Sequence, residues 1–379
     1  MKIVIATDSF KGTLKADEAC KIISNEIREY LSDATISIKP LADGGEGTAR
    51  AMISATGGQW IHKKVMGPLE SMRVRAGFAW LPERTAVVEM ASASGLERLS
   101  PEQMNPMETT TYGTGELIHA ATENGARKIL LAVGGSATVD GGVGAAMALG
   151  WAFLNQNNGP IPLGGRGLEI ISKIEPPKVL LRSSDPQKSI PVEVLCDVDN
   201  RLCGDDGAAR IYGPQKGATP EMVERLDRGL SRLARIVREQ WNRDIAGVPG
   251  AGAAGGLAAG AMAFMNATLV SGIDKIIAYS DLRTELESAD WIITGEGSFD
   301  HQSLSGKVIS GVVKLARQSS TRVAIIAGQV KVPHEEYAQI GIETAIATKP
   351  ADMPLDEALQ DSRTLLRSAT RHFVTKYLV

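Results

Sequence analysis

The hydrophobic pattern at the start of the chain alternates short apolar runs with amphipathic segments. Residues 2–7 form a β-branched apolar run that is typical of a strand covered on both faces. Residues 15–31 carry apolar side chains at helical spacing, and residues 36–41 form a second apolar run. A predicted helix over 46–55 completes a β-α-β-α order, which is the usual opening of a parallel sheet.

The pattern changes in the middle of the chain. Residues 60–66, 74–81 and 85–90 read as consecutive strands separated by turns, and residues 155–190 are rich in Gly, Pro and Asn and are expected to be irregular. Further predicted elements are helices over 115–124, 141–153 and 220–242 and strands over 128–133 and 192–196.

The last hundred residues return to the opening pattern. The predicted elements there are strands over 291–294 and 323–327, a helix over 306–318 and a mostly helical end over 355–378. The simplest architecture is therefore α/β, with one parallel-sheet domain made from both chain ends and a second α/β domain inserted into it. We expect residues 1–66 and 272–379 to form the first domain and residues 67–271 the second, with each crossing placed to within about ten residues.

Composition supports this class and excludes others. The 379 residues are 43% hydrophobic but only 4% aromatic, and they include 40 glycines, a mix typical of α/β enzymes. The formal net charge of −3 gives no indication of nucleic-acid binding. Cys20, Cys196 and Cys203 form no CxxC pair, which argues against a disulfide framework. With no signal-peptide pattern at residue 1 and no long apolar segment, we expect a cytoplasmic protein without a membrane span.

Glycine-rich loops that carry acids or lysines follow many of the predicted strands. Open parallel sheets bind ligands at the carboxyl ends of their strands, so these loops are the candidate site. They cover residues 7–13, 42–48, 109–116, 134–142, 196–200, 213–218, 250–256 and 294–303.

Residues 134–142, GGSATVDGG, form the best candidate for a phosphate cradle. They follow a predicted strand and open a predicted helix, where bare backbone N–H groups attract anions. The alternative is a tight strand–helix turn without a ligand. Gly250–Gly255 also matches G-x-G-x-x-G, but Pro249 precedes it instead of a strand, so close helix packing or nucleotide phosphates fit it better than a nicotinamide dinucleotide. Neither a P-loop nor a protein-kinase catalytic loop is present.

Carboxylates gather at the same predicted edges of the sheets. They are Asp8, Asp43, Glu46, Asp140, Asp197, Asp199, Glu296 and Asp300. Converging carboxylates repel one another unless a cation is present, which indicates a metal–nucleotide site for phosphoryl transfer. Mg²⁺ takes one or two carboxylates and keeps several waters. Lys11 and Lys216 lie in similar loops, although a lysine beside a glycine is often merely solvated.

These loops resemble the glycerate kinase family, in the bacterial branch that includes glycerate 2-kinase. The resemblance covers residue 8 to about residue 308 and lies in DSFKGTL, ADGGEGT, MASASGLE, TTTYGTGELI, GGSATVDGG, CDVDN, GPQKGATPE, PGAGAAGGL, ITGEGSFDHQS and GKV. It implies a Rossmann-like domain with an inserted second domain and a cleft between them. It also implies ATP- and Mg²⁺-dependent phosphorylation of D-glycerate, with 2-phosphoglycerate as the usual product of this branch.

We assign roles from residue type and loop position within this resemblance. The predicted catalytic residues are Asp43, Lys11, Asp197, Lys216 and Asp300, with Asp300 or Asp197 as the base and the lysines neutralising phosphate or the glycerate carboxylate. The predicted nucleotide-binding residues are Gly134, Gly135, Ser136, Thr138, Gly252 and Gly255. The predicted substrate-binding residues are Asp8, Ser9, Gly44, Gly45 and Glu46, and the predicted metal ligands are Asp43, Asp197 and Glu296.

Three positions depart from the pattern of the family. Members often have Pro at positions 7 and 201 and Arg at position 298, where this chain has Thr7, Arg201 and Ser298. The change at Ser298 removes a cation beside Glu296 and Asp300. Either the choice of substrate shifts, or Arg201 supplies the missing charge from another loop.

Two other functions remain open at this point. Gly250–Gly255 would suit an NAD-dependent oxidoreductase acting on a small hydroxy acid, and Ser298 would suit a catalytically silent protein that binds a sugar acid. For the kinase we expect a small-molecule substrate, no nucleic-acid or membrane partner, and a monomer or homodimer.

Overall fold

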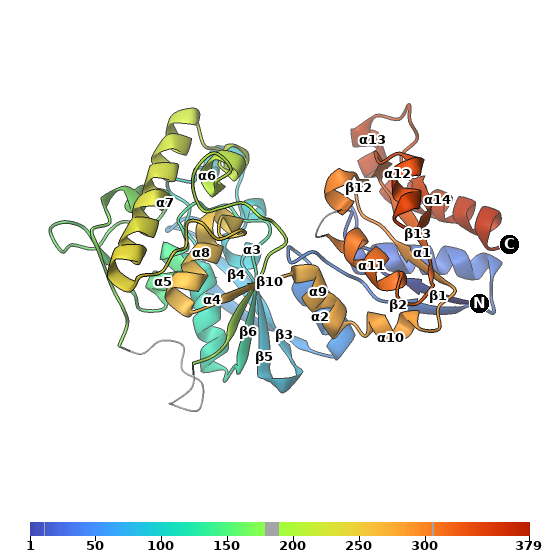
Figure 1. The fold of residues 1–379 in the computed structure, drawn as a ribbon, viewed down its shortest axis with the longest axis horizontal. Coiled ribbons are helices and arrows are strands. Elements are labelled where there is room, and N and C mark those ends of the chain that lie inside the picture. The colour runs from blue at the N-terminus through green and yellow to red at the C-terminus, as the bar shows by residue number, and fades with distance from the viewer. Residues whose placement is uncertain (11, 179–188, 305–306) are drawn as a thin grey trace. The chain divides into compact units, whose positions relative to one another are not determined.

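The computed structural model describes residues 1–10, 12–178, 189–304 and 307–379, and it confirms an α/β fold (Figure 1). Backbone contacts divide the chain into two compact units. Unit 1 contains residues 1–43, 50–56 and 273–379, and unit 2 contains residues 44–49 and 57–272.

Unit 1 contains a five-stranded sheet with the order β15-β13-β11-β1-β2, in which every neighbouring pair is parallel. Its strands are β1 (Lys2–Ile5), β2 (Thr35–Ile38), β11 (Trp291–Thr294), β13 (Arg322–Ala327) and β15 (Ile342–Ala347), and β12 (Ser298–Phe299) pairs separately with β14 (Gln329–Val330). Its helices are α1 (Ala16–Tyr30), α2 (Thr48–Thr56, begun in unit 2), α9 (Gly272–Tyr279), α10 (Leu282–Leu286), α11 (Val308–Ala316), α12 (His334–Gln339), α13 (Leu355–Gln360) and α14 (Ser362–Tyr377).

The two ends of the chain build the core of unit 1 together. Helices α1 and α14, blue and red in Figure 1, lie side by side. Alternate residues of the strands, such as Ile3 and Ile5 of β1, pack with Ile23 of α1 and Phe373 of α14. Period-two alternation in the strands therefore meets the apolar stripe of each helix, which is why distant segments fold as one unit.

Unit 2 contains a six-stranded sheet with the order β10-β9-β6-β5-β4-β3. Strands β10, β9, β6 and β5 are parallel, whereas β4 and β3 form an antiparallel hairpin at the edge. The strands are β3 (Gln59–Met66), β4 (Arg73–Leu81), β5 (Thr85–Glu89), β6 (Lys128–Ala132), β9 (Val192–Leu195) and β10 (Thr268–Val270), with a separate pair β7 (Ala152–Leu154) and β8 (Lys173–Glu175). The helices are α3 (Ala91–Ser94), α4 (Tyr112–Glu123), α5 (Val143–Ala148), α6 (Ala208–Tyr212), α7 (Pro220–Trp241) and α8 (Ala253–Met265).

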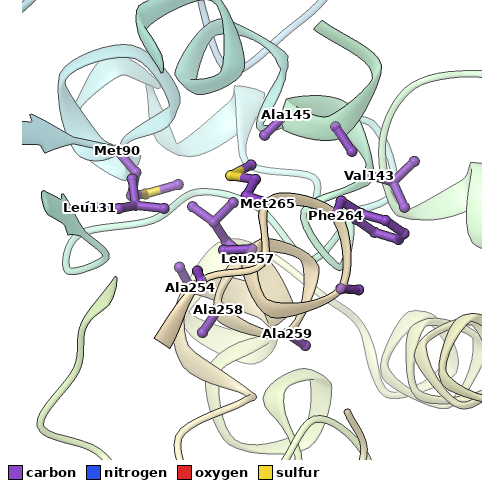
Figure 2. Packing of buried hydrophobic residues seen from close by; sticks show 14 of the residues in the cluster. Met90, Leu131, Val143, Ala145, Ala254, Leu257, Ala258, Ala259, Phe264 and Met265 are labelled. Carbon is purple, nitrogen blue, oxygen red and sulfur yellow. The ribbon is translucent and has the colours of Figure 1, made fainter. Parts of the chain in front are cut away.

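Helix α8 lies in the core of unit 2 and is buried along nearly its whole length. Figure 2 shows its side chains, among them Leu257 and Phe264, gathered near Val143 and Ala145 of α5. A helix that is apolar on all sides is buried on all sides. The Ala- and Gly-rich sequence is what lets neighbouring segments approach it closely, because small side chains leave room for the opposing backbone.

The predicted elements agree with the structure in the opening β-α-β-α segment, in the strands of the middle region and in α7. One expectation is wrong: the helix predicted over 141–153 is only α5, six residues long, after which residues 152–154 form a strand. Residues 57–66, which we placed in the first domain, group with unit 2 because β3 pairs along its whole length with β4.

The sequence pattern also missed several elements. Helix α8 and strand β10 were not predicted, and neither was the edge strand β15. Among the residues that the structure describes, no helix is long and apolar enough to cross a membrane.

Candidate active site

The cradle loop, residues 134–142, follows β6 at the carboxyl end of the sheet of unit 2. The backbone of residues 94–96 holds it in place: Leu96 N–H donates to the Gly135 carbonyl (2.9 Å), and Ala137 N–H donates to the Ser94 carbonyl (3.0 Å). Gly135 is exposed while Ser136 and Thr138 are buried, so the start of the loop is the part that meets solvent. Gly135, Gly141 and Gly142 all have positive φ, which permits the tight path of the loop.

Lys216 lies beneath the cradle loop and is only 2% exposed. Its ammonium donates to Ser136 Oγ (2.6 Å) and to the Thr138 carbonyl (2.8 Å). Burial lowers the pKa of Lys216 from its usual 10.5 to about 7, although the charge of Asp140 opposes this shift. The interpretation of Lys216 as a merely solvated lysine is therefore wrong, because the fold buries it against the predicted phosphate loop.

Asp140 ties the cradle loop to the start of α4. Its buried carboxylate accepts the backbone N–H of Thr111 (2.8 Å) and the Thr111 hydroxyl (2.9 Å), and also the N–H of Gly142 (3.1 Å). Burial nevertheless raises the pKa of Asp140, with these hydrogen bonds opposing the shift. Since α5 has only six residues, the order of this loop comes from side chains such as Asp140 more than from a long helix.

Residues 44–49 lie against the same edge of the sheet of unit 2. A Cβ atom on Gly134 would come within 2.4 Å of Gly45 Cα, and one on Gly44 would come within 3.1 Å of the Leu195 carbonyl. Ala49 N–H donates to Glu89 Oε1 (2.8 Å) at the end of β5. The fold thus brings predicted substrate residues Gly44 and Gly45 next to the predicted phosphate cradle, whereas Glu46 is exposed.

Asp197 follows β9 at this edge. Its Oδ1 accepts the N–H of Gly272 (3.0 Å), and its charge contributes to a raised pKa of the neighbouring Cys196 thiol, for which burial is the main cause. Asp197 is half-buried, so its carboxylate is not sequestered from a ligand.

In unit 1 the predicted acids follow β1, β2 and β11. Asp8 is 5% exposed, and its Oδ1 accepts the N–H of Ser9 (2.6 Å). Asp43, Glu296 and Asp300 are half-buried. The structure therefore places these predicted residues at the carboxyl edge of one parallel sheet.

Glu296 is the acid of unit 1 with the most unusual environment. Its Oε1 is buried without a hydrogen-bond partner among the described residues. Burial raises its pKa, the Ser303 hydroxyl and the Lys307 charge oppose the shift, and Asp43 and Asp300 raise the pKa further. A carboxylate that is desolvated beside other carboxylates is stabilised by a cation.

These residues fit a magnesium ion that keeps most of its waters. No cluster of three or more His, Cys, Asp or Glu side chains with metal-binding geometry occurs among the described residues. Mg²⁺ needs only one or two carboxylates. Glu296 suits it, because its Oε1 has no hydrogen-bond partner among the described residues and the charge of Asp43 is close enough to raise its pKa. Asp197 belongs to the other unit.

Gly252 and Gly255 have a clear packing reason to be glycine. A Cβ atom would come within 2.2 Å of the Arg201 carbonyl at Gly252 and within 1.9 Å of the Thr138 carbonyl at Gly255. Gly255 also has a φ of 65°. Residues 242–252 before α8 contain no strand, so the structural context of a dinucleotide fingerprint is missing.

The remaining predicted residues divide as follows. Lys11 lies outside the described residues. Ser298 Oγ donates to Asp300 Oδ2 at 3.5 Å in unit 1, whereas Arg201 lies in unit 2. The sequence analysis did not assign a role to Glu89, although a charged residue at the end of the apolar run TAVVE could have indicated one. It also assigned no role to Asp140, which stood among the candidate acids.

The fold and the site define the class of the protein: an α/β scaffold of two units, in each of which parallel strands end in glycine-rich, acid-bearing loops, and in unit 2 one such loop is held by a buried lysine. The model of the glycerate kinase family matches residues 3–378, and the chain belongs to that family.

Curated relatives and a solved structure agree with this assignment. The chain is 41% identical to a glycerate kinase of Halalkalibacterium halodurans, over 98% of this chain and 96% of that protein. It is also 41% identical to glycerate 2-kinase of Escherichia coli, over 98% of this chain and 97% of that protein. A crystal structure described as glycerate kinase 2 of Salmonella typhimurium LT2 superposes with a TM-score of 0.82 at 40% identity, covering 99% of this chain and 97% of that one.

Proposed function

We propose that the protein transfers the γ-phosphoryl group of ATP to the 2-hydroxyl of D-glycerate, giving 2-phosphoglycerate and ADP. The observation that carries this proposal is the buried Lys216, hydrogen-bonded to the cradle loop through Ser136 and Thr138 in a chain of the glycerate kinase family. A lysine is held in a dry site below a glycine loop at a cost in desolvation, and an anion above the loop offsets that cost.

The nucleotide phosphates would bind at the start of the cradle loop. Gly134 and Gly135 lack side chains that would block close approach, and Ser136 offers a hydroxyl. Thr138 is fully buried, so it would support the loop from inside instead of contacting the phosphates. Within the described residues, no protein acceptor contacts the backbone N–H of Gly135 or Ser136, so these donors are available to phosphate oxygens. Gly255 would support the cradle by packing against Thr138, whereas Gly252 packs against residues 200–201.

Mg²⁺ would be held by Asp43 and Glu296, and it would neutralise charge on the transferring phosphoryl group. Asp197 keeps its predicted role as a further metal contact or as the base, and Asp300 is the other candidate for the base. The base accepts the proton of the glycerate hydroxyl while the hydroxyl oxygen forms its bond to phosphorus and the bond to ADP breaks. Asp8, Ser9, Gly44, Gly45 and Glu46 would position glycerate.

The same proposal includes where the protein acts and what it binds. A cytoplasmic enzyme suits the sparse free cysteines, Cys20, Cys196 and Cys203. We propose a small-molecule substrate, no nucleic-acid or membrane partner, and a monomer or homodimer. The oxidoreductase and silent-binder alternatives receive no support from the family match or from the relatives.

The test is a reaction of the purified protein with D-glycerate, ATP and Mg²⁺, followed by phosphorus NMR of the product. We expect the signal of 2-phosphoglycerate together with stoichiometric ADP. A 3-phosphoglycerate signal would keep the kinase and overturn the regiochemistry. ADP formation only with a different hydroxy acid would point to the departure at Ser298, and the absence of ADP with every acceptor would overturn the proposal.

A further inference from the structure

Lys216 is too deeply buried to reach a ligand directly. Its side chain is among the largest fully buried ones, and its residue exposure is 2%. Two of its ammonium N–H groups are already directed at the cradle loop, at Ser136 Oγ and the Thr138 carbonyl. A phosphate above the exposed Gly135 is therefore separated from the ammonium by the loop itself.

The chemistry of an ammonium fixes the direction of the hydrogen bond to Ser136. A lysine ammonium has three donors and no acceptor, so Ser136 Oγ must accept the bond of 2.6 Å. The serine O–H is then left to donate elsewhere, and among the described residues the structure gives it no acceptor. Ser136 is followed by Ala137, whose carbonyl and N–H are both bonded within the protein, so the backbone that carries Ser136 is held in place.

We propose that Lys216 is a positioning residue, which orients the Ser136 hydroxyl as a hydrogen-bond donor to a phosphate group of the bound nucleotide. This inference rests on the proposed kinase function, because it names the nucleotide as the anion. Ser136 would contact the phosphate directly, and Lys216 would act on it only through Ser136. The sequence alone had left two partners open for Lys216, a phosphate or the glycerate carboxylate.

Asp140, near the end of the cradle loop, acts on Lys216 through its charge. It is 1% exposed, and its charge is the electrostatic influence that favours the protonated form of Lys216. Thr111 and Gly142 hold the Asp140 carboxylate in place. A neutral amine has a lone pair that can accept the Ser136 O–H, whereas the ammonium has none. Since the pKa of Lys216 is about 7 in the free protein, the availability of the Ser136 O–H for a ligand should decline as the pH rises through neutrality.

A double-mutant cycle tests the indirect role. Ser136→Ala, Lys216→Met and the double variant are compared for binding of a non-hydrolysable ATP analogue with Mg²⁺ by calorimetry, and for kcat/KM. Each single variant should lose about 10- to 100-fold in affinity, the range for a hydrogen bond to a charged group. Lys216→Met should cost no more than about 3-fold when Ser136 is already Ala, because the coupled effect has been removed.

Matched variants separate positioning from general damage. Lys128→Met changes a lysine at the opposite end of β6, where it pairs with Glu193, and Ser24→Ala removes a buried hydroxyl of α1 that has no hydrogen-bond partner among the described residues. Both should bind the analogue like the unmodified protein. Ser136→Thr keeps the hydroxyl and should recover most of the affinity that Ser136→Ala loses.

The pH profile gives a readout that a purely structural role would not move. The unmodified protein should lose kcat/KM above about pH 7, and this decline should disappear in both Lys216→Met and Ser136→Ala. If the affinity losses of the two single variants multiply in the double variant, or if kcat/KM of Ser136→Ala still declines above about pH 7, Lys216 contacts the nucleotide directly and the inference is overturned. A phosphorylated Ser136 after rapid quench would overturn it in favour of a serine nucleophile. No binding of the analogue by the unmodified protein would overturn both this inference and the kinase proposal.

Discussion

At the scale of the residue, the chemistry of this protein depends on burying charged groups at the ends of parallel strands. Lys216, Asp140 and Glu296 all have shifted pKa values, and in each the largest cause is desolvation by burial. Folding energy is spent to keep these groups out of water, and perturbed groups gathered in this way are typical of functional sites. Each shift makes the stability or activity of the protein depend on pH or on a bound ion.

The buried Lys216 predicts how stability changes with pH. The unfolded lysine titrates near 10.5 and the folded one near 7, so below about pH 7 the cost of burying the charge is fully present. Between these values the unfolded state binds more protons, and the free energy of unfolding therefore rises with pH. We expect the melting temperature of the unmodified protein relative to Lys216→Met to increase from pH 6 to pH 10, measured by calorimetry. A constant difference would contradict the lowered pKa.

Glu296 Oε1, which has no hydrogen-bond partner in the part of the chain that the structure describes, predicts a defect in metal use. Glu296→Gln and Asp43→Asn should each raise the Mg²⁺ concentration for half-maximal turnover by at least about 10-fold, because each removes one charged ligand from an ion that takes few. The protein should stay folded, since a neutral amide at 296 avoids the desolvation cost that raises the pKa of Glu296. Asp352→Asn, at an exposed acid, is the control. An unchanged Mg²⁺ requirement in both variants would refute these ligands.

At the scale of the element, loops and not long helices shape the candidate site. Helix α5 has six residues, and the cradle loop owes its path to glycines with positive φ, to Asp140 and to the backbone of residues 94–96. Helix α8 supports the cradle loop by packing closely against it. This is possible because Gly255 and Gly256 have no side chains, so the first turn of the helix contacts residues 138–141. The G-x-G-x-x-G match of this segment thus reflects close packing.

Gly255→Ala tests that explanation. The added methyl group would lie 1.9 Å from the Thr138 carbonyl, and the residue has a φ of 65°. We expect a loss of about 2–4 kcal/mol in the free energy of unfolding, from strain and backbone collision together. Gly204→Ala, with positive φ but no atom within 4 Å of the new Cβ, should lose only about 1–2 kcal/mol. Urea denaturation followed by circular dichroism measures both, and equal losses would count against the packing role.

At the scale of the whole molecule, the chain makes two units that each have a core. The core cluster around Phe264 and Leu257 lies in unit 2, and the one around Trp291 and Phe373 lies in unit 1. The polypeptide passes between the units at several places, near residues 43, 49, 56 and 272. Damage to one core should therefore appear first in the segments of its own unit, even where these are distant in sequence.

Hydrogen exchange of peptides from each unit can test whether damage to one core stays within its own unit. Phe373→Ala removes a fully buried ring that lies 5.1 Å from the ring of Trp291, at a cost of about 3–5 kcal/mol. Exchange should accelerate in peptides of β1, α1, β11 and α14 and stay nearly unchanged in β6 and α8. Phe264→Ala should show the reverse pattern. Equal acceleration throughout the chain in either variant would mean that the two units unfold as one.

The sequence by itself determined the α/β class, most strands and long helices, and the family. Those features are local: period-two and helical spacing appear in short windows, and motifs such as GGSATVDGG are contiguous. It could also place acids and glycines at strand ends, because that needs only the order of elements. It could not show the short α5, or β3 joining unit 2, since strand pairing and the length of a helix in a crowded core depend on distant neighbours.

Only the tertiary structure decided which of the candidate residues act together. Lys216 and Ser136 are 80 positions apart, and nothing in the sequence around Lys216 distinguishes a buried ammonium from a solvated one. The same holds for Glu89, which contacts residue 49, and for Asp140, which contacts Thr111. Burial and pairing are properties of the folded environment, so the residue types could be read from the chain, but their pKa values and partners required the fold.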